Sequence, residues 1–389
     1  MLFDEIVKSS YSGPEYPVLG AFSREWAFSR PFEGLRVLAA TPVFRNTLLQ
    51  YRALLAGGAN LVVGIAGSGK DCAGADAAGA AMPCDLGIVD VLRENGIPVI
   101  GVQEALEMEA RCADSGDSAF DLILDCAGQF SACHPRFGFV ELTRSGVQFY
   151  ENCEHPVYVA DSGIVKRIET CLGTGEGYVR ALAQLGHDFD DGKKFVVFGS
   201  GKVGQGIVLQ LLRSGANVQV VTDCSRGSNA FLDANGVPVT DCNDLDGVAA
   251  LVRDADFVVT ATGVKGALDR PQIVEALLAS DAVLANMGVE DEYGPGVPAT
   301  RVLAEKKPLN FILEEPTHLK YIDASLALHA ALGELLLQEA AGVSSQESAS
   351  AANKKAGPLD PPSELEQRIL SMTMQDGLIG AEIAEMLGW

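Results

Sequence analysis

Short apolar runs alternate with stretches of helical spacing along most of this chain, and this alternation limits the folds open to it. Five runs occupy the first half: LRVLAA (35–40), NLVVGI (60–65), IPVIGV (97–102), FDLILD (120–125) and HPVYVAD (155–161). Four more occupy the second: FVVF (195–198), VQVVT (218–222), DFVVTAT (256–262) and AVLAN (282–286). Strands that alternate with helices predict a parallel sheet covered by helices on both faces. We therefore expect an α/β protein made of two such halves.

A glycine-rich turn follows the first strand of the second half. The segment GSGKVG (199–204) lies between the predicted strand and a helical pattern, IVLQLLRSG. In that position the glycines permit a tight turn and close approach of a pyrophosphate, which the helix N-terminus then holds. An acid is expected about twenty residues later, at the end of the next strand, where Thr222 and Asp223 stand. The turn predicts a Rossmann dinucleotide site; the acid favours NAD, and Arg226 leaves NADP open.

Two predicted helices connect the halves, one at 164–186 and one returning at 319–341. We assign 1–163 to the first part of a discontinuous, doubly wound α/β substrate domain and 164–318 to the Rossmann domain with its connecting helix. The helix 319–341 returns to the substrate domain, residues 342–361 read as a Ser/Ala/Pro-biased linker, and 362–389 as a helical segment. The first thirty or so residues are expected to wrap the surface. Two independent domains in tandem are the alternative.

Charge and cysteine content exclude several classes of function. The chain has 29 basic and 52 acidic residues, a net charge of −23, which repels nucleic-acid phosphates and anionic lipid. It has no apolar stretch long enough to span a membrane and no signal-peptide pattern at its start. Nine scattered cysteines without metal spacing indicate reduced thiols and no metal site. We expect a cytoplasmic protein that acts on a small molecule.

A second glycine loop, GIAGSGK (64–70), has the spacing of a P-loop. The next residue is Asp71, not the Ser or Thr that would hold magnesium. Nucleotide hydrolysis is therefore not favoured, and Lys70 is kept as a candidate for an anionic part of the substrate.

The order of segments resembles that of S-adenosylhomocysteine hydrolases over roughly 35–290. The matching pieces are GGANLVV, ENGIPVIGV, FDLILDCAG, VELTRSGV, KRIETCLGTGEG, FVVFGSGKVGQG, DFVVTATG and VLANMG. The resemblance implies tightly held NAD facing a split substrate domain, in a homo-oligomer, a dimer or tetramer. It also implies chemistry in which NAD oxidises a ribose hydroxyl, the ketone drives loss of a thiolate, water adds, and the hydride returns. The NAD contacts that it implies are Gly199, Ser200, Gly201, Lys202, Val203, Gly204, Thr222, Asp223, Thr143, Ser145, Thr260, Ala261, Thr262, Gly263 and Asn286.

Outside the cofactor half the chain departs from the family. Asp125-Cys126 stands where the family has two aspartates, and Glu141-Leu142 where it has two glutamates. Pro42 and Val289 replace family histidines, and only a one-residue shift lets Lys166 stand for the family lysine. The cofactor half is thus kept and the chemistry half rewritten, which predicts a divergent member acting on a different substrate.

Five residues are candidates for catalysis: Lys166, Asp125, Glu141, Cys126 and His329. Lys166 could steady a hydroxyl or ketone, or be an ordinary surface lysine. Asp125 and Glu141 end strands where α/β folds bind ligands, but either could cap a helix or pair with Arg144. Cys126 could be a nucleophile or inert packing, and His329 could face the cofactor or be a hydrogen-bonded core histidine.

Three functions remain open at this point. The first is an NAD-dependent enzyme, similar to S-adenosylhomocysteine hydrolase, that oxidises a carbinol of another small molecule, with or without elimination and hydrolysis. The second is a plain NAD(P)-dependent dehydrogenase that releases the reduced cofactor at each turnover. The third is a non-catalytic, NAD-binding paralogue with a regulatory role.

Overall fold

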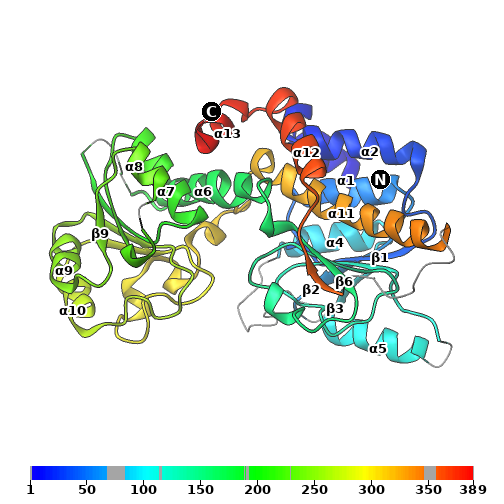
Figure 1. Ribbon diagram of the computed structural model, residues 1–389, viewed down its shortest axis with the longest axis horizontal. Coiled ribbons are helices and arrows are strands. Elements are labelled where there is room, and N and C mark those ends of the chain that lie inside the picture. The colour runs from blue at the N-terminus through cyan, green and yellow to red at the C-terminus, as the bar shows by residue number, and fades with distance from the viewer. Residues whose placement is uncertain are drawn as a thin grey trace. The chain divides into compact units, whose positions relative to one another are not determined.

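The strands of the computed structural model pair in parallel and form two separate sheets. The structure describes residues 2–67, 84–113, 116–187, 189, 192–227, 229–345 and 356–388. The chain divides into unit 1, Met1–Ile168 with Leu319–Trp389, and unit 2, Glu169–His318 (Figure 1). The boundary falls five residues after the predicted start of the second domain, and the C-terminal segment belongs to unit 1.

Unit 1 is built on a seven-stranded sheet in the order β12-β6-β5-β4-β1-β2-β3. Its strands are β1 (Arg36–Ala39), β2 (Asn60–Ile65), β3 (Val99–Gly101), β4 (Leu122–Asp125), β5 (Gly138–Glu141), β6 (Pro156–Val159) and β12 (Gly357–Leu359). The strand order reverses direction between β1 and β4, so the loops after these two strands flank the crevice where α/β sheets bind ligands. The predicted doubly wound α/β fold is confirmed for this unit.

The helices of unit 1 include both ends of the chain. They are α1 (Leu2–Ser10), α2 (Pro17–Ser29), α3 (Leu48–Ala56), α4 (Leu86–Glu94), α5 (Val102–Ala113), α11 (Leu319–Ser345), α12 (Ser363–Asp376) and α13 (Gly380–Leu387). The return helix α11 packs on β4 and β5 and contacts α2, α3 and α12.

The expectation that the first thirty residues only wrap the surface is wrong. They form α1 and α2, and α2 buries Phe22 and Trp26. The buried carboxylate of Asp323, on α11, accepts hydrogen bonds from the backbone N–H groups of Val18 and Leu19, at 2.9 and 3.1 Å. A carboxylate at this point satisfies the first turn of a helix and its dipole. Helix α2 is therefore fixed to the core of the unit.

Part of the predicted linker is also structured. Helix α11 continues to Ser345, and β12 pairs in parallel with β6 through Gly357, Pro358 and Leu359. A three-residue strand containing Gly and Pro has little β propensity of its own, so its pairing depends on the sheet edge that it meets.

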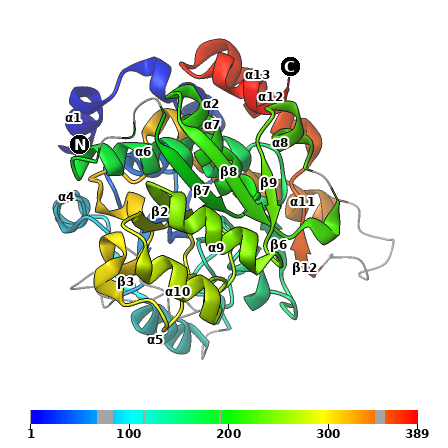
Figure 2. The same cartoon turned by 90° about the vertical axis from the view of Figure 1, so that its left-hand side faces the viewer.

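Unit 2 has a five-stranded sheet in the order β11-β10-β7-β8-β9. Its strands are β7 (Lys194–Phe198), β8 (Asn217–Thr222), β9 (Val239–Asp241), β10 (Phe257–Thr260) and β11 (Val283–Asn286). Its helices are α6 (Thr174–Gln184), α7 (Lys202–Arg213), α8 (Ala230–Ala234), α9 (Leu245–Asp254) and α10 (Pro271–Ala279), and Figure 2 looks onto this unit.

Alternate side chains of the unit 2 strands build two cores. Phe195 and Val197 of β7 join the core under α6 and α7, while Val196 and Phe198 join the core under α9 and α10. Burial on both faces is what the continuous apolar runs of the sequence predict for a parallel sheet. The expected Rossmann architecture is confirmed.

The connecting helix predicted at 164–186 does not run as one regular helix. A π-helical turn, Ile168–Gly173, precedes α6. A Cβ added at Gly175 would lie 2.3 Å from the carbonyl oxygen of Gly206, and one at Gly206 would lie 1.8 Å from that of Cys171. These two glycines let α6 and α7 pack backbone to backbone.

Seven described cysteines take part in no disulfide, but Cys84 is disulfide-bonded, contrary to the expectation of reduced thiols throughout. The expectation therefore needs correction at Cys84, because a disulfide depends on which sulfur atoms the fold brings together and not on sequence spacing.

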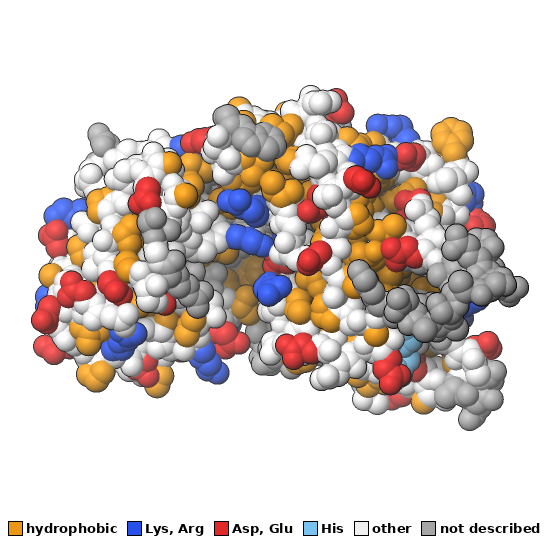
Figure 3. Space-filling model, viewed as in Figure 1, with side chains coloured by type: hydrophobic (Ala, Val, Ile, Leu, Met, Phe, Trp, Pro, Cys, Tyr) orange, Lys and Arg blue, Asp and Glu red, His pale blue; other side chains and the backbone are white. Residues whose placement is uncertain are grey.

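Over the residues described, no helix has both the length and the apolar character needed to cross a bilayer. On the face drawn in Figure 3, carboxylates and basic side chains of unit 2 are interspersed.

Candidate dinucleotide site and strand-end polar clusters

The glycine turn of unit 2 has the backbone geometry that the sequence predicts. Gly199 has a φ of +107°, and an added Cβ would lie 2.3 Å from the carbonyl oxygen of Ala261. A Cβ on Gly204 would lie 2.1 Å from the carbonyl oxygen of Gly199, so the third glycine lets α7 pack against the turn. Gly201 differs: nothing lies within 4 Å of its added Cβ. The first and third glycines serve packing, and the second leaves open space in front of the backbone.

A cavity of about 1030 Å³ opens at this turn. It lies along the carboxyl ends of β7, β8 and β10, where the strand order reverses. Gly201 is the N-cap of α7 and has no side chain to bond the first-turn N–H groups. Such N–H groups, with the helix dipole, bind phosphate. Lys202, Val203 and Gly204 form the first turn of α7, directly after Gly201.

The end of β8 supplies the polar wall of the cavity. The hydroxyls of Thr222 and Ser200 lie 2.9 Å apart and bond to each other. Asp223 is exposed in the cavity, and its Oδ1 accepts a hydrogen bond from Ser225 N at 2.9 Å. Thr222 and Asp223, the two residues predicted near the ribose, both line the cavity, and so does Asp233 of α8.

The turn after β10 is held from behind by a residue that sequence reasoning missed. Thr262 N and Oγ1 both donate to one oxygen of buried Glu292 at 2.8 Å, and Gly263 N donates to the other at 2.7 Å. Burial raises the pKa of Glu292. Ala261 and Thr262 line the cavity. The Thr262 and Gly263 N–H groups and the Thr262 hydroxyl are thus used within the protein, which leaves the carbonyl groups of this turn for a ligand.

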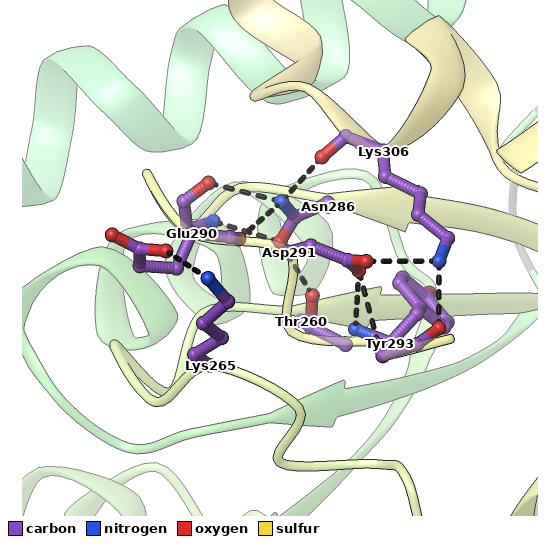
Figure 4. Close-up of polar contacts among 9 residues, drawn as sticks. Thr260, Lys265, Asn286, Glu290, Asp291, Tyr293 and Lys306 are labelled. Carbon is purple, nitrogen blue, oxygen red and sulfur yellow. Dashed lines mark hydrogen bonds and ion pairs between the residues drawn. The ribbon is translucent and has the colours of Figure 1, made fainter. Parts of the chain in front are cut away.

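Thr260 and Asn286 lie deeper, in the network of Figure 4. Both are fully buried, and Thr260 Oγ1 donates to Asn286 Oδ1 at 2.8 Å. The Asn286 amide nitrogen contacts the carbonyl oxygens of Gly288, Glu290 and Lys306 at 2.6–3.0 Å. Neither residue lines the cavity, so their geometry supports a role in holding the strand ends, and direct contact with a cofactor stays a prediction.

In unit 1, Asp125 and Glu141 lie side by side at the ends of β4 and β5. Asp125 accepts hydrogen bonds from Cys126 N, Phe130 N and the Tyr150 hydroxyl. Burial raises the pKa of Asp125 to about 8, with a further contribution from the charge of Glu141. The adjacent carboxyl groups therefore disfavour simultaneous ionisation.

Glu141 organises the loop that follows β4. Its carboxylate accepts from Ala127 N at 2.9 Å, Gly128 N at 3.0 Å and the Thr143 N and Oγ1 atoms at 2.7 and 2.6 Å. Burial raises the pKa of Glu141 as well. The suggested pairing with Arg144 is wrong, because Arg144 is exposed and the carboxylate is turned into the core.

The other three catalytic candidates also lie in unit 1. Lys166 is only 2% exposed, so the alternative of an ordinary surface lysine is wrong. Cys126 is buried at the end of β4. His329 bonds to Gln50 Nε2 through Nδ1 at 3.1 Å and to the Val140 carbonyl through Nε2 at 2.9 Å.

The environment of His329 favours the neutral ring. Burial, together with the charge of Lys166, lowers its pKa to about 4. With both nitrogens bonded, the ring links α11 to β5 and to Gln50 of α3, which favours a structural role. Gln50, also bonded to Thr41 Oγ1 at 3.1 Å, had no sequence signal of its own.

The remaining sequence candidates lie elsewhere in unit 1. Thr143 bonds to Glu141, and Ser145 Oγ donates to Thr143 Oγ1 at 3.2 Å. Their predicted contact with a cofactor stays a prediction. Lys70 and Asp71 lie outside the described residues. Among the side chains that the structure describes, no group of three His, Cys, Asp or Glu is arranged to hold a metal ion.

Comparisons with known proteins agree with the geometry of unit 2. Residues 187–288 match a family model described as "Putative NAD(P)-binding". Adenosylhomocysteinase of Thermoplasma acidophilum is 27% identical over 306 residues, covering 72% of this chain and 68% of the relative. These likenesses support a distant relationship to adenosylhomocysteinase.

Two further matches cover more of the chain at lower identity. S-inosyl-L-homocysteine hydrolase of Methanopyrus kandleri is 23% identical over 414 aligned positions, covering 95% of this chain and 89% of the relative. Among solved structures, transhydrogenase from Sinorhizobium meliloti matches with 14% identity and a TM-score of 0.42, covering 78% of this chain and 94% of that one.

The family match and the glycine turn together support a nicotinamide dinucleotide as the ligand of unit 2. The residues present fit such a group, because Gly201 leaves open the space that a pyrophosphate needs and Asp223 lies in the same cavity. Unit 2 is thus similar to NAD(P)-binding domains, and the chain is distantly similar to adenosylhomocysteinase.

Proposed function

We propose that this protein is an NAD-dependent enzyme, similar to adenosylhomocysteinase, that oxidises a carbinol of a small molecule other than S-adenosylhomocysteine. The observation that carries the proposal is the open space in front of the Gly201 backbone, at the N-terminus of α7. Asp223 lies in the same cavity. A bound nicotinamide would accept hydride from the carbinol carbon.

The choice of NAD over NADP is supported by the charge of the cavity. Asp223 and Asp233 both line it, and the cation among its lining residues, Arg270, donates to the carbonyl oxygen of Cys242 at 2.8 Å. A carboxylate at the end of the second strand accepts hydrogen bonds from ribose hydroxyls and repels a 2′-phosphate. Two carboxylates make a phosphorylated ribose still less favourable.

A changed substrate is supported by the substitutions in unit 1. Cys126, Leu142 and Pro42 replace two acids and a histidine expected from the resemblance. We propose that Lys166 holds the reacting hydroxyl and receives or returns its proton. Asp125 and Glu141 bond mainly to backbone N–H groups, which supports positioning of the 126–130 loop as their part in the reaction.

The test is the content of the purified protein. The protein is denatured, and the released nucleotide is identified by mass spectrometry and counted per chain. Near-stoichiometric NAD, part of it reduced, is expected from a cofactor that is recycled inside the site. A site that is empty but binds added NAD weakly would favour a plain dehydrogenase. Absence of NAD(P) binding under all conditions would overturn the proposal.

Turnover separates an enzyme from a non-catalytic paralogue. Nucleoside, thioether and hydroxy-acid substrates are screened with the loaded protein, with S-adenosylhomocysteine as the expected negative. Conversion that disappears in Lys166→Met, with NAD content unchanged, is the expected result. A bound cofactor without conversion, together with a co-purifying partner chain, would favour the regulatory role.

We also propose that the protein is a cytoplasmic homo-oligomer, a dimer or tetramer. The support is the resemblance of the chain to adenosylhomocysteinase. Light scattering of the purified protein tests the oligomeric state, and a single-chain mass would contradict it.

A further inference from the structure

Three consecutive acids, Glu290, Asp291 and Glu292, follow strand β11 in unit 2, and they differ in how their charges are matched. Glu290 lies 3.8 Å from the amino group of Lys265. Asp291 lies 2.9 Å from that of Lys306 (Figure 4). Glu292 is fully buried, and in the described part of the chain no lysine, arginine or histidine pairs with it.

The partners of Glu292 favour its ionised form. Both carboxylate oxygens accept hydrogen bonds, from Thr262 N, Thr262 Oγ1 and Gly263 N, and all three groups act as donors. Burial raises the pKa of Glu292, and these hydrogen bonds, which favour the charged form, oppose that rise. When ionised, Glu292 is a buried negative charge that is balanced by hydrogen bonds and not by a cation.

This charge lies directly behind the wall of the dinucleotide cavity. Thr262, which donates two bonds to Glu292, lines the cavity together with Ala261 and Val264. A dinucleotide binds across the point where the strand order reverses, with its adenosine toward the acid that follows the second strand. Here that acid is Asp223 after β8, so the end of β10 is left for the nicotinamide half.

We propose that Glu292 makes this site prefer the oxidised over the reduced cofactor. The inference rests on the proposed binding of NAD. The oxidised nicotinamide ring is a cation and the reduced ring is neutral, so a fixed anion behind Thr262 stabilises only the oxidised form. Burial reduces screening of this charge by solvent and salt.

The preference suits the proposed reaction. An enzyme that begins by oxidising a carbinol must have oxidised cofactor bound before the substrate arrives. Glu292 is then a positioning residue in two respects, because the same carboxylate fixes the Thr262 turn and biases the charge of the ring beside it. These two effects can be separated by substitution.

The experiment compares dissociation constants for NAD⁺ and NADH in four proteins: wild type, Glu292→Gln, Glu292→Asp and Glu290→Gln. NADH binding is followed by its fluorescence and NAD⁺ by competition, after removal of bound cofactor. Glu292→Gln is expected to raise the ratio Kd(NAD⁺)/Kd(NADH) at least about fivefold, which equals about 1 kcal/mol. Glu290→Gln makes the same change two residues away and should leave the ratio unchanged.

Glu292→Asp distinguishes charge from shape. It keeps the anion but shortens its reach, so both affinities should fall while the ratio stays near that of the wild type. If Glu292→Gln is too unstable to assay, judged by its thermal transition, Glu292→Ala replaces it as the neutral variant.

Two outcomes are separated clearly. Equal weakening of NAD⁺ and NADH binding by the neutral variant means that Glu292 is only structural, and the inference is overturned. Failure of the wild type to bind either form of the cofactor counts against the proposed function instead.

Discussion

Alanine substitutions at two glycines of the same turn, Gly201 and Gly204, should have opposite consequences. At Gly201 an added methyl meets no atom within 4 Å, and the backbone, with φ of −73° and ψ of −172°, is allowed for any residue. The folded state therefore has room for alanine. Restricting the unfolded chain should stabilise the protein by about 0.4–1 kcal/mol, a rise in Tm of roughly 1–4 °C for a unit of this size.

Cofactor binding should respond in the other direction. The methyl of Gly201→Ala would occupy the space that a pyrophosphate needs in order to reach the N-terminus of α7. Loss of one hydrogen bond from an N–H group to a charged phosphate costs about 1.5–3 kcal/mol. We expect Kd for NAD to rise by about 10- to 150-fold, measured by titration calorimetry of protein freed of bound cofactor.

Gly204→Ala is the matched control. Its methyl would lie 2.1 Å from the carbonyl oxygen of Gly199, so α7 must shift away from the turn. Overpacking of this kind costs about 1–3 kcal/mol, and Tm should fall. A Gly201→Ala protein that binds NAD as the wild type does would show that the pyrophosphate does not occupy the open space at Gly201. A lowered Tm for that variant would show that the folded protein has no room for a methyl group there.

Three further predictions follow from the described contacts. Asp223→Asn should shift the ratio of NAD to NADP affinity toward NADP by about tenfold, since a repulsive charge is removed; titration with both cofactors checks this, and an unchanged ratio would contradict it. Burial raises the pKa of Asp323 from an ordinary 3.8 to about 7. Between about pH 4 and 7 the folded protein therefore binds a proton that the unfolded chain does not. The stabilisation that this proton gives is complete below about pH 4 and is lost as the pH rises through 7. In denaturant unfolding, the unfolding free energy of the wild type should fall relative to that of Asp323→Asn from about pH 4 to 7. A difference that stays constant with pH would show that Asp323 does not titrate there. His329→Gln should lower the unfolding free energy by about 1–3 kcal/mol, because Gln50 and Val140 lose a buried partner; a stability equal to that of wild type would contradict the structural role.

The sequence predicts those parts of the fold that have strong local patterns. The apolar runs of both sheets and the turn at Gly199 meet this condition, because burial on two faces requires continuous apolar residues. Strand β9 is a half-exposed Val-Thr-Asp, and β12 is Gly-Pro-Leu within a Ser- and Ala-rich segment. Pairing with a neighbouring strand makes each of them a strand, and a local pattern cannot show that neighbour.

The sites follow the same division. Asp125, Glu141 and Asp223 could be selected because they end recognisable strands. Glu292 could not, because its proposed role depends on its hydrogen bonds to Thr262, which lies thirty residues earlier in the chain. The burial of Lys166 was equally hidden, since it results from packing of segments far apart in the sequence.

The pairing of β12 with β6 has a consequence for the order in which the protein can be made. Unit 2 is one continuous segment, Glu169–His318, and all of it has been synthesised before α11 begins. The sheet of unit 1 is completed only when Gly357–Leu359 emerges from the ribosome, and until then the edge of β6 has open hydrogen-bonding groups. An open strand edge is a template for association with other chains. The nascent protein thus passes through a stage in which the dinucleotide unit can be folded while its partner unit is still vulnerable to aggregation.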